Sequence, residues 1–173
     1  MITIICSTNR KDAVSQTVAN TYVDILKSHE AAHQFINLAD LPADFTFTAL
    51  YENSGKNEAF NTYRDMMKDS EKFVFIVPEY NGSFPGVLKA FIDGLQFPDS
   101  FTGKKAALVG VSSGIQGAGL ALSHLTDIFN YCGTHVLAFK PKLMHIEANM
   151  VDGKLSDMYH QLLEQQASDI VNF

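Results

Sequence analysis

Six consecutive residues have the side chains in this sequence that are best suited to binding a ligand. They are Pro78, Glu79, Tyr80, Asn81, Gly82 and Ser83. The run lies between the apolar stretch Phe73–Val77 and Pro85, which opens a stretch with helical periodicity, so it is expected to be a strand-to-helix loop. Ligands of open α/β sheets bind just outside the carboxyl ends of the strands. Polar groups, a ring face and a glycine at that place fit a planar aromatic ligand. A plain turn would account for Pro, Asn and Gly, but not for the Glu-Tyr pair.

A second polar loop follows the apolar run Met1–Cys6 and leads into another helical stretch. A helix amino terminus offers free N–H groups and a positive dipole end, which together suit a phosphate. Arg10 adds a charge-assisted contact that can be bidentate. An ordinary helix cap by Asp12 or Ser15 remains an alternative explanation. The candidate phosphate-binding residues are Thr8, Asn9, Arg10, Ser15, Gln16 and Thr17.

A third loop, Ser112–Gly119, follows the apolar run Ala106–Val111 and holds three glycines within six residues. This glycine content predicts a backbone that approaches a flat ligand closely. No G-x-G-x-x-G pattern follows the first strand, so a Rossmann dinucleotide-binding domain is not supported. The candidate ligand-binding residues of this loop are Ser112, Ser113, Gly114 and Gln116.

The elements that position these loops alternate along the chain. Short apolar runs, expected to be strands, lie at Met1–Cys6, Gln34–Leu38, Phe73–Val77, Ala106–Val111 and Thr134–Phe139. Amphipathic stretches, expected to be helices, lie at Val14–Leu26, Asn57–Met67, Val87–Leu95, Ala118–Tyr131 and Met158–Val171. This alternation predicts an α/β fold in three layers, a flavodoxin-like sandwich with a five-stranded parallel sheet of order 2-1-3-4-5. Residues 1–173 are expected to form a single domain.

Composition narrows the function classes. The net charge of −6 argues against a nucleic-acid interface, which needs a basic face. Cys6 and Cys132 lie in or beside apolar segments and are expected to be buried free thiols in a reducing cytoplasm. No apolar stretch approaches the ~20 residues that span a bilayer, and no signal segment precedes the first strand-like run. No pair of histidines shows metal-ligand spacing, so no metal site is predicted.

The three loops together resemble the NADPH-dependent FMN reductase family. Pro78–Ser83, followed by Pro85 and Gly86, matches the flavin-contacting loop of that family without a gap. Thr8-Asn9-Arg10 is similar to the core of its phosphate loop, and Leu122–Tyr131 is similar to its continuation after the third loop. The resemblance extends from Met1 to about Phe139.

The resemblance implies an oxidoreductase that uses FMN as cofactor and NAD(P)H as co-substrate. The first loop would hold the phosphate of FMN, and Pro78–Ser83 would hold the edge of the flavin ring. The third side of the flavin would be held by Ser112, Ser113, Gly114 and Gln116. Electrons would pass to a small acceptor, which in this family is a flavin, a quinone, an azo compound or a metal oxyanion. A homodimer or homotetramer is expected. No side chain is predicted to be catalytic, Glu79 included, because the cofactor supplies the chemistry.

The chain departs from the family pattern at the phosphate loop. A serine-containing pair of that family falls on Ala13 and Val14, so at least one phosphate-binding hydroxyl is missing and weaker FMN binding is expected. A non-enzymatic binding protein on the same fold is therefore one alternative. A flavodoxin-type electron carrier without a nicotinamide site is a second alternative, independent of Ala13 and Val14. The irregular segment Ala39–Gly55, which is rich in aromatic residues, is expected to be a surface loop, a flap over a ligand or a contact with a partner subunit.

Overall fold

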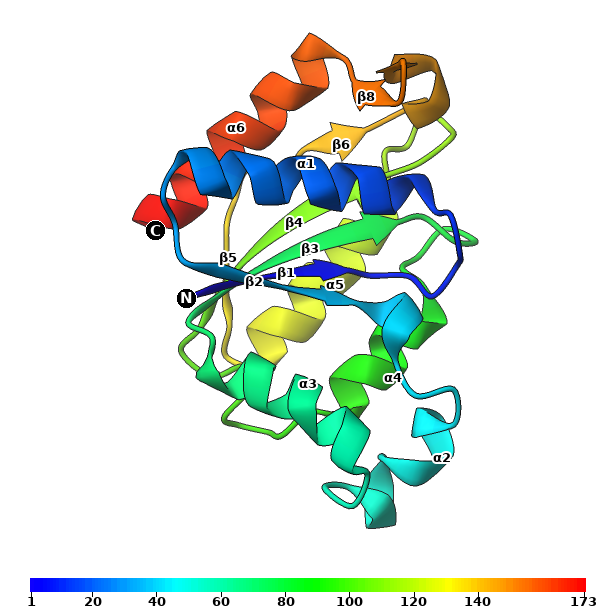
Figure 1. The fold of residues 1–173 in the computed structure, drawn as a ribbon, viewed down its shortest axis with the longest axis vertical. Coiled ribbons are helices and arrows are strands. Elements are labelled where there is room, and N and C mark those ends of the chain that lie inside the picture. Colours follow the sequence, from blue (N-terminus) through cyan, green and yellow to red (C-terminus); the bar gives the residue numbers. More distant parts are fainter.

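The computed structural model describes residues 1–173. A parallel sheet forms its centre, and the strand order is β2-β1-β3-β4-β5, which confirms the predicted order. The strands are β1 (Ile2–Cys6), β2 (His33–Asn37), β3 (Lys72–Pro78), β4 (Lys105–Val111) and β5 (His135–Val136). Because these strands run in the same direction, their carboxyl ends meet at one edge of the sheet (Figure 1).

Helices cover both faces of the sheet. The helices α1 (Val14–Ser28) and α6 (Asp157–Asn172) lie on one face, and the other face is covered by α3 (Glu58–Asp69), α4 (Gly86–Gly94) and α5 (Gly119–Tyr131) (Figure 1). Each of the expected helices is present, and its ends lie within two residues of the predicted ones. The result is the predicted three-layer α/β sandwich.

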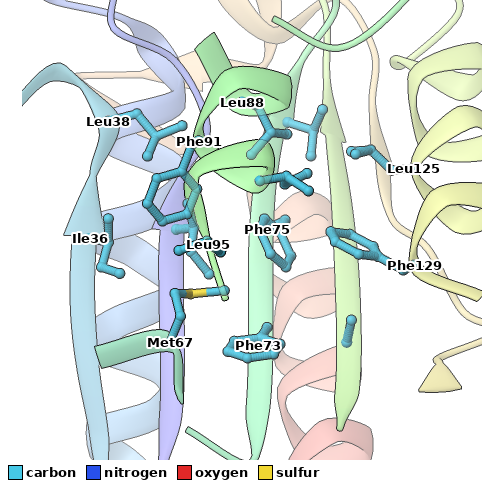
Figure 2. Close-up of a cluster of buried hydrophobic side chains, with 14 of the residues drawn as sticks. Ile36, Leu38, Met67, Phe73, Phe75, Leu88, Phe91, Leu95, Leu125 and Phe129 are labelled. Atoms are coloured by element: carbon cyan, nitrogen blue, oxygen red, sulfur yellow. The ribbon is translucent and has the colours of Figure 1, made fainter. Parts of the chain in front are cut away.

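The core is divided by the sheet into two clusters of buried side chains. Strand β3 shows the division, because Phe73 and Phe75 belong to one cluster while Val74 and Ile76 belong to the other. Successive side chains of a strand point to opposite faces, so a strand covered on both sides must be apolar throughout. Figure 2 shows the cluster under α3, α4 and α5, where Phe75 and Phe129 have ring centroids 4.7 Å apart.

The fifth strand differs from the prediction of one continuous run over Thr134–Phe139. It breaks after β5 and resumes as β6 (Lys142–Leu143), which also pairs with β4. Pro141 lacks an N–H group and cannot extend the ladder as a donor. The buried amide of Gln166 on α6 fills the gap, since its Nε2 donates to Leu108 O at 3.0 Å and to Phe139 O at 3.0 Å.

The segment predicted to be irregular, Ala39–Gly55, contains short helical turns. These are the end of η1 (Leu38–Asp40), α2 (Phe45–Thr48) and η2 (Tyr51–Asn53). Phe45 and Leu50 are buried in the core, whereas Phe47 and Tyr51 are 81% and 77% exposed. Hydrogen bonds from Asn53 to Phe47 O and from Asn57 to Thr48 brace the segment. It is therefore an anchored arm that presents two aromatic rings to solvent.

The chain after the fifth strand returns to the edge of the sheet where the strands end. It forms η3 (Ile146–Asn149) and a small antiparallel hairpin of β7 (Met150–Val151) and β8 (Lys154–Leu155) before α6 begins. None of the helices combines the length and the apolar character that crossing a membrane requires. Both cysteines are free thiols; Cys6 is buried as expected, but Cys132 is only partly buried.

Candidate active site

The loops that follow β1, β3 and β4 meet beyond the carboxyl edge of the sheet and surround a cavity of about 190 Å³. The sequence-predicted residues that line it are Arg10, Ser15, Pro78, Glu79, Tyr80, Ser112 and Ser113. Parallel strands bring their following loops to the same edge, which explains how segments about 100 residues apart share one cavity. The three predicted loops therefore form a single site.

The first loop presents an open helix amino terminus to this cavity. Helix α1 begins after Ala13, has no side-chain cap and has no acidic residue in its first turn. Neither Asp12 nor Ser15 caps the helix, so the capping alternative is wrong. Ser15 is 2% exposed and lines the cavity, and its hydroxyl forms no hydrogen bond within the chain. Arg10, on the same wall, forms no ion pair. A hydroxyl without a partner in the chain, a cation and free helix N–H groups suit an anion.

The second loop contains a tight turn. Tyr80 and Ser83 exchange backbone hydrogen bonds of 2.8 and 3.0 Å. Asn81 and Gly82 between them have φ values of 51° and 75°. These left-handed values are those of a type I′ turn, for which Asn-Gly is the preferred pair. Turn geometry thus accounts for Asn81 and Gly82, while the Ser83 hydroxyl lies 2.9 Å from His124 Nδ1 on α5.

Glu79 connects the second loop to the third. Its Oε2 accepts a hydrogen bond from the backbone N–H of Ala118 at 3.0 Å, directly before helix α5. Ala118 has a φ of 61°, so the chain enters α5 through a left-handed residue. A carboxylate at a helix amino terminus satisfies a free N–H group and interacts favourably with the helix dipole. Glu79 therefore holds two loops of the site together.

The third loop is braced from within. The Ser112 hydroxyl donates to Gly114 O at 2.8 Å and accepts from the N–H of Gly117 at 2.9 Å. A side chain at Gly117 would lie 2.6 Å from the Cβ atom of Lys142, so this glycine is required by packing against β6. Gly114 has open space around it. The glycines of this loop were expected to allow close approach of a ligand, but Gly117 allows close packing within the chain instead.

Two residues on the fourth side of the cavity, Ile146 and Glu147 of η3, were not predicted from the sequence. Glu147 Oε1 accepts a hydrogen bond from the Ser113 hydroxyl at 2.7 Å. This bond is the main cause that lowers the pKa of Glu147, and the positive charge of Arg10 contributes. No motif surrounds Glu147. The only indication in the sequence that Glu147 could line the cavity was its position after the fifth strand, because the strands of a parallel sheet end at the same edge.

The remaining predicted residues lie in the same loops but do not line this cavity. Thr8 is buried behind it, and Gln16 lines an adjoining cavity of about 400 Å³, where its Oε1 accepts from Asn37 Nδ2 at 2.8 Å. Cys6 also faces that adjoining cavity, and burial raises the pKa of its thiol to about 11. The predicted residues outside the 190 Å³ cavity are Thr8, Asn9, Gln16, Thr17, Asn81, Gly82, Ser83, Gly114 and Gln116.

Two solved structures with the same fold are flavoproteins by their descriptions. The flavoenzyme NAD(P)H:(acceptor) oxidoreductase FerB from Paracoccus denitrificans superposes with a TM-score of 0.77 at 24% identity, covering 99% of this chain and 94% of that one. An FMN-dependent NADH-azoreductase from Bacillus anthracis, solved with FMN, gives a TM-score of 0.67 at 16% identity, covering 99% and 100%. At these identities the likeness establishes the flavodoxin-like fold.

Sequence comparison is more specific. A NAD(P)H-dependent FMN reductase from Pseudomonas aeruginosa is 34% identical over 134 residues, which cover 72% of each chain. A 2-hydroxy-1,4-benzoquinone reductase from Burkholderia is 27% identical over 133 residues, covering 75% of this chain and 70% of the relative. The profile of the NADPH-dependent FMN reductases matches residues 1–140, which include the three loops. The chain therefore belongs to the NADPH-dependent FMN reductase family, a family of oxidoreductases.

Proposed function

We propose that residues 1–173 act as one FMN-binding domain that passes electrons from NAD(P)H through FMN to a small acceptor. One observation carries most of the proposal. The uncapped start of α1, the unpaired Arg10 and the hydroxyl of Ser15, which has no hydrogen-bond partner in the chain, face one cavity. An ionised phosphate offers the acceptor oxygens that these donors lack. The chemistry of the donors thus fits the phosphate of FMN.

The assignment of the site follows from this fit. Arg10, Ser15 and the first N–H groups of α1 hold the phosphate, aided by Thr8, Asn9, Gln16 and Thr17 of the same loop. The edge of the ring is held by Pro78–Ser83, and its third side by Ser112, Ser113, Gly114 and Gln116. The internal bonds of Glu79 and Ser112 keep these loops in place before the ligand arrives, so little ordering is needed on binding.

When bound, FMN supplies the two-electron chemistry, accepting a hydride from the nicotinamide and passing the electrons to the acceptor. The chain contributes binding and orientation. The cavity has no histidine in its lining, and its two carboxylates are occupied by hydrogen bonds to Ala118 N and to Ser113 Oγ. We therefore assign no catalytic side chain.

The names of the relatives support a choice of acceptor class. Those described above reduce FMN or a benzoquinone according to their names. A flavin or a quinone is accordingly the first choice, ahead of azo compounds and metal oxyanions. The two free thiols fit a reducing compartment, and we propose a cytoplasmic location.

We also propose a homodimer or homotetramer in which the arm around α2 contributes contacts. Phe47 and Tyr51 are large, exposed aromatic side chains on an anchored backbone, which is the character of interface hot spots. Light scattering of the wild type and of a Phe47→Ser/Tyr51→Ser double variant tests this assignment. A smaller assembly for the variant would support it, and an unchanged mass would contradict a role of the arm.

The function is tested by visible absorption spectroscopy of the protein with added FMN, followed by anaerobic NADPH and NADH. Perturbed flavin bands that bleach with either nucleotide are the expected result. Bound flavin that neither nucleotide bleaches would instead indicate a flavodoxin-type electron carrier. Absence of any bound flavin would indicate a non-enzymatic protein on this fold. Rates with a quinone, free riboflavin and an azo dye then rank the acceptors.

A further inference from the structure

Glu147 adds a negative charge to the cavity that the proposed function assigns to FMN. It comes from η3, beyond the residues 1–140 that match the family profile. The Ser113 hydroxyl donates to the exposed Glu147 carboxylate at 2.7 Å and holds it on the cavity wall. Nothing in the family resemblance assigns a role to this residue.

The charges and donors around the cavity are few. Arg10 is the one cation in the lining of the cavity. Ala13 and Val14, at the start of α1, contribute only apolar side chains to the lining. Glu79 is held by the N–H of Ala118, so its charge is partly compensated by the start of α5. Glu147 accepts from the neutral Ser113 hydroxyl, and a backbone N–H group also contributes to its lowered pKa. It is the second carboxylate on the wall of a cavity whose only lining cation is Arg10.

The ionisation of Glu147 is secure at neutral pH. The Ser113 bond and the positive charge of Arg10 both lower its pKa, which places Arg10 and Glu147 in the same electrostatic neighbourhood. An ionised carboxylate near Arg10 competes with any anion for that guanidinium. A phosphate at the start of α1 is such an anion, and like charges repel.

We infer that Glu147 opposes the phosphate of FMN and weakens the binding of FMN to this chain. The inference rests on the proposed function. Two features of the chain act in the same direction, because the hydroxyl missing at Ala13 removes an attraction and Glu147 adds a repulsion.

The test compares the binding of FMN with that of riboflavin, which has the same ring and lacks the phosphate. The variant is Glu147→Gln, which removes the charge and keeps an oxygen that can accept from Ser113. The matched control is Glu71→Gln, which makes the same change in net charge at the opposite edge of the sheet, where Glu71 is 79% exposed. Dissociation constants are measured by quenching of flavin fluorescence.

Glu147→Gln is expected to bind FMN about two- to fivefold more tightly than the wild type, the range of one exposed charge interaction. Riboflavin binding is expected to stay the same, and Glu71→Gln is expected to match the wild type with both ligands. The gain in FMN affinity of Glu147→Gln should be smaller at about 1 M salt, because the Debye length there is only about 3 Å. Dialysis should strip FMN from the wild type faster than from Glu147→Gln.

Equal or weaker FMN binding by Glu147→Gln would overturn the inference, as would an equal gain for riboflavin. Glu147→Ala provides a second variant, with the same expected direction, if the glutamine variant fails to fold. Failure of the proposed function looks different, because then neither flavin binds to the wild type, or NAD(P)H does not bleach bound FMN. A wild type that binds FMN and is bleached, yet is indifferent to Glu147→Gln, would refute the inference alone.

Discussion

The hydroxyl group of Tyr80 lies 2.7 Å from Oγ1 of Thr8, and this contact joins the loops that follow β1 and β3. Thr8 Oγ1 also accepts the backbone N–H of Arg10 at 3.2 Å. The proposed phosphate loop and the proposed flavin loop are thereby linked through two buried or half-buried side chains. The position of Arg10 consequently depends on a residue of the neighbouring loop.

Tyr80→Phe removes this link without removing the ring. Because Arg10 loses part of its support, we expect weaker FMN binding by about two- to tenfold, together with a loss of about 1 kcal/mol in unfolding free energy. Fluorescence titration and urea unfolding measure the two effects. Tyr63→Phe is the matched control, since its hydroxyl donates to Asp40 O at 3.0 Å, away from the site. A loss of FMN affinity in Tyr63→Phe as well would contradict the explanation.

Ala13→Ser supplies the missing hydroxyl. Ala13 is the residue before α1, with extended φ and ψ values of −70° and 135°, a conformation in which serine caps a helix well. We expect the apo protein to gain about 1 kcal/mol of stability from the cap. FMN binding should tighten by about two- to tenfold if the hydroxyl reaches the phosphate. Thermal unfolding with and without FMN separates these effects, and a gain in riboflavin affinity of the same size would argue against phosphate recognition.

Gln166→Leu tests the break in the fifth strand. The substitution leaves the carbonyl groups of Leu108 and Phe139 without their donor in a buried place and removes the partner of the Tyr22 hydroxyl. Each unsatisfied buried group costs about 1–3 kcal/mol, so a loss of several kcal/mol in unfolding free energy is expected. The control is Gln165→Leu at the exposed neighbouring position, where a change within about 0.5 kcal/mol is expected. Similar losses in the two variants would refute the bridging role.

The pKa of Glu147 is lowered by the Ser113 bond from its ordinary value of 4.5, so the ionised carboxylate stabilises the folded state. This contribution is present above about pH 4.5 and is lost as the pH falls through the lower folded pKa. Ser113→Ala should therefore be less stable than the wild type at neutral pH, by less than about 1 kcal/mol because the carboxylate is exposed. The difference between the two proteins should shrink as the pH falls below 4.5 and through the lower folded pKa. Urea unfolding at neutral pH and in a series of acidic buffers checks this, and a difference that stays constant down to the lowest pH would contradict it.

Much of the fold was predictable because its signals are local. The apolar run Phe73–Val77 and the amphipathic stretch Val87–Leu95 each indicate their element without reference to the rest of the chain. A parallel sheet with helices on both faces leaves few topologies open once the elements alternate. Strand ends then place the following loops at one edge, which is why Pro78–Ser83 and the loop after Cys6 were correctly expected to meet.

The sequence by itself determined the family, the three-layer fold and the three loops of the site, because each depends on residue types that are close together along the chain. Only the tertiary structure decided that Glu79 holds the start of α5, that Gln166 fills the gap in the fifth strand and that Glu147 lines the cavity. These contacts join residues far apart in the sequence, and no local pattern marks them. Their partners are set by the packing of β4, β6 and α6 around the edge of the sheet, which composition and periodicity do not encode.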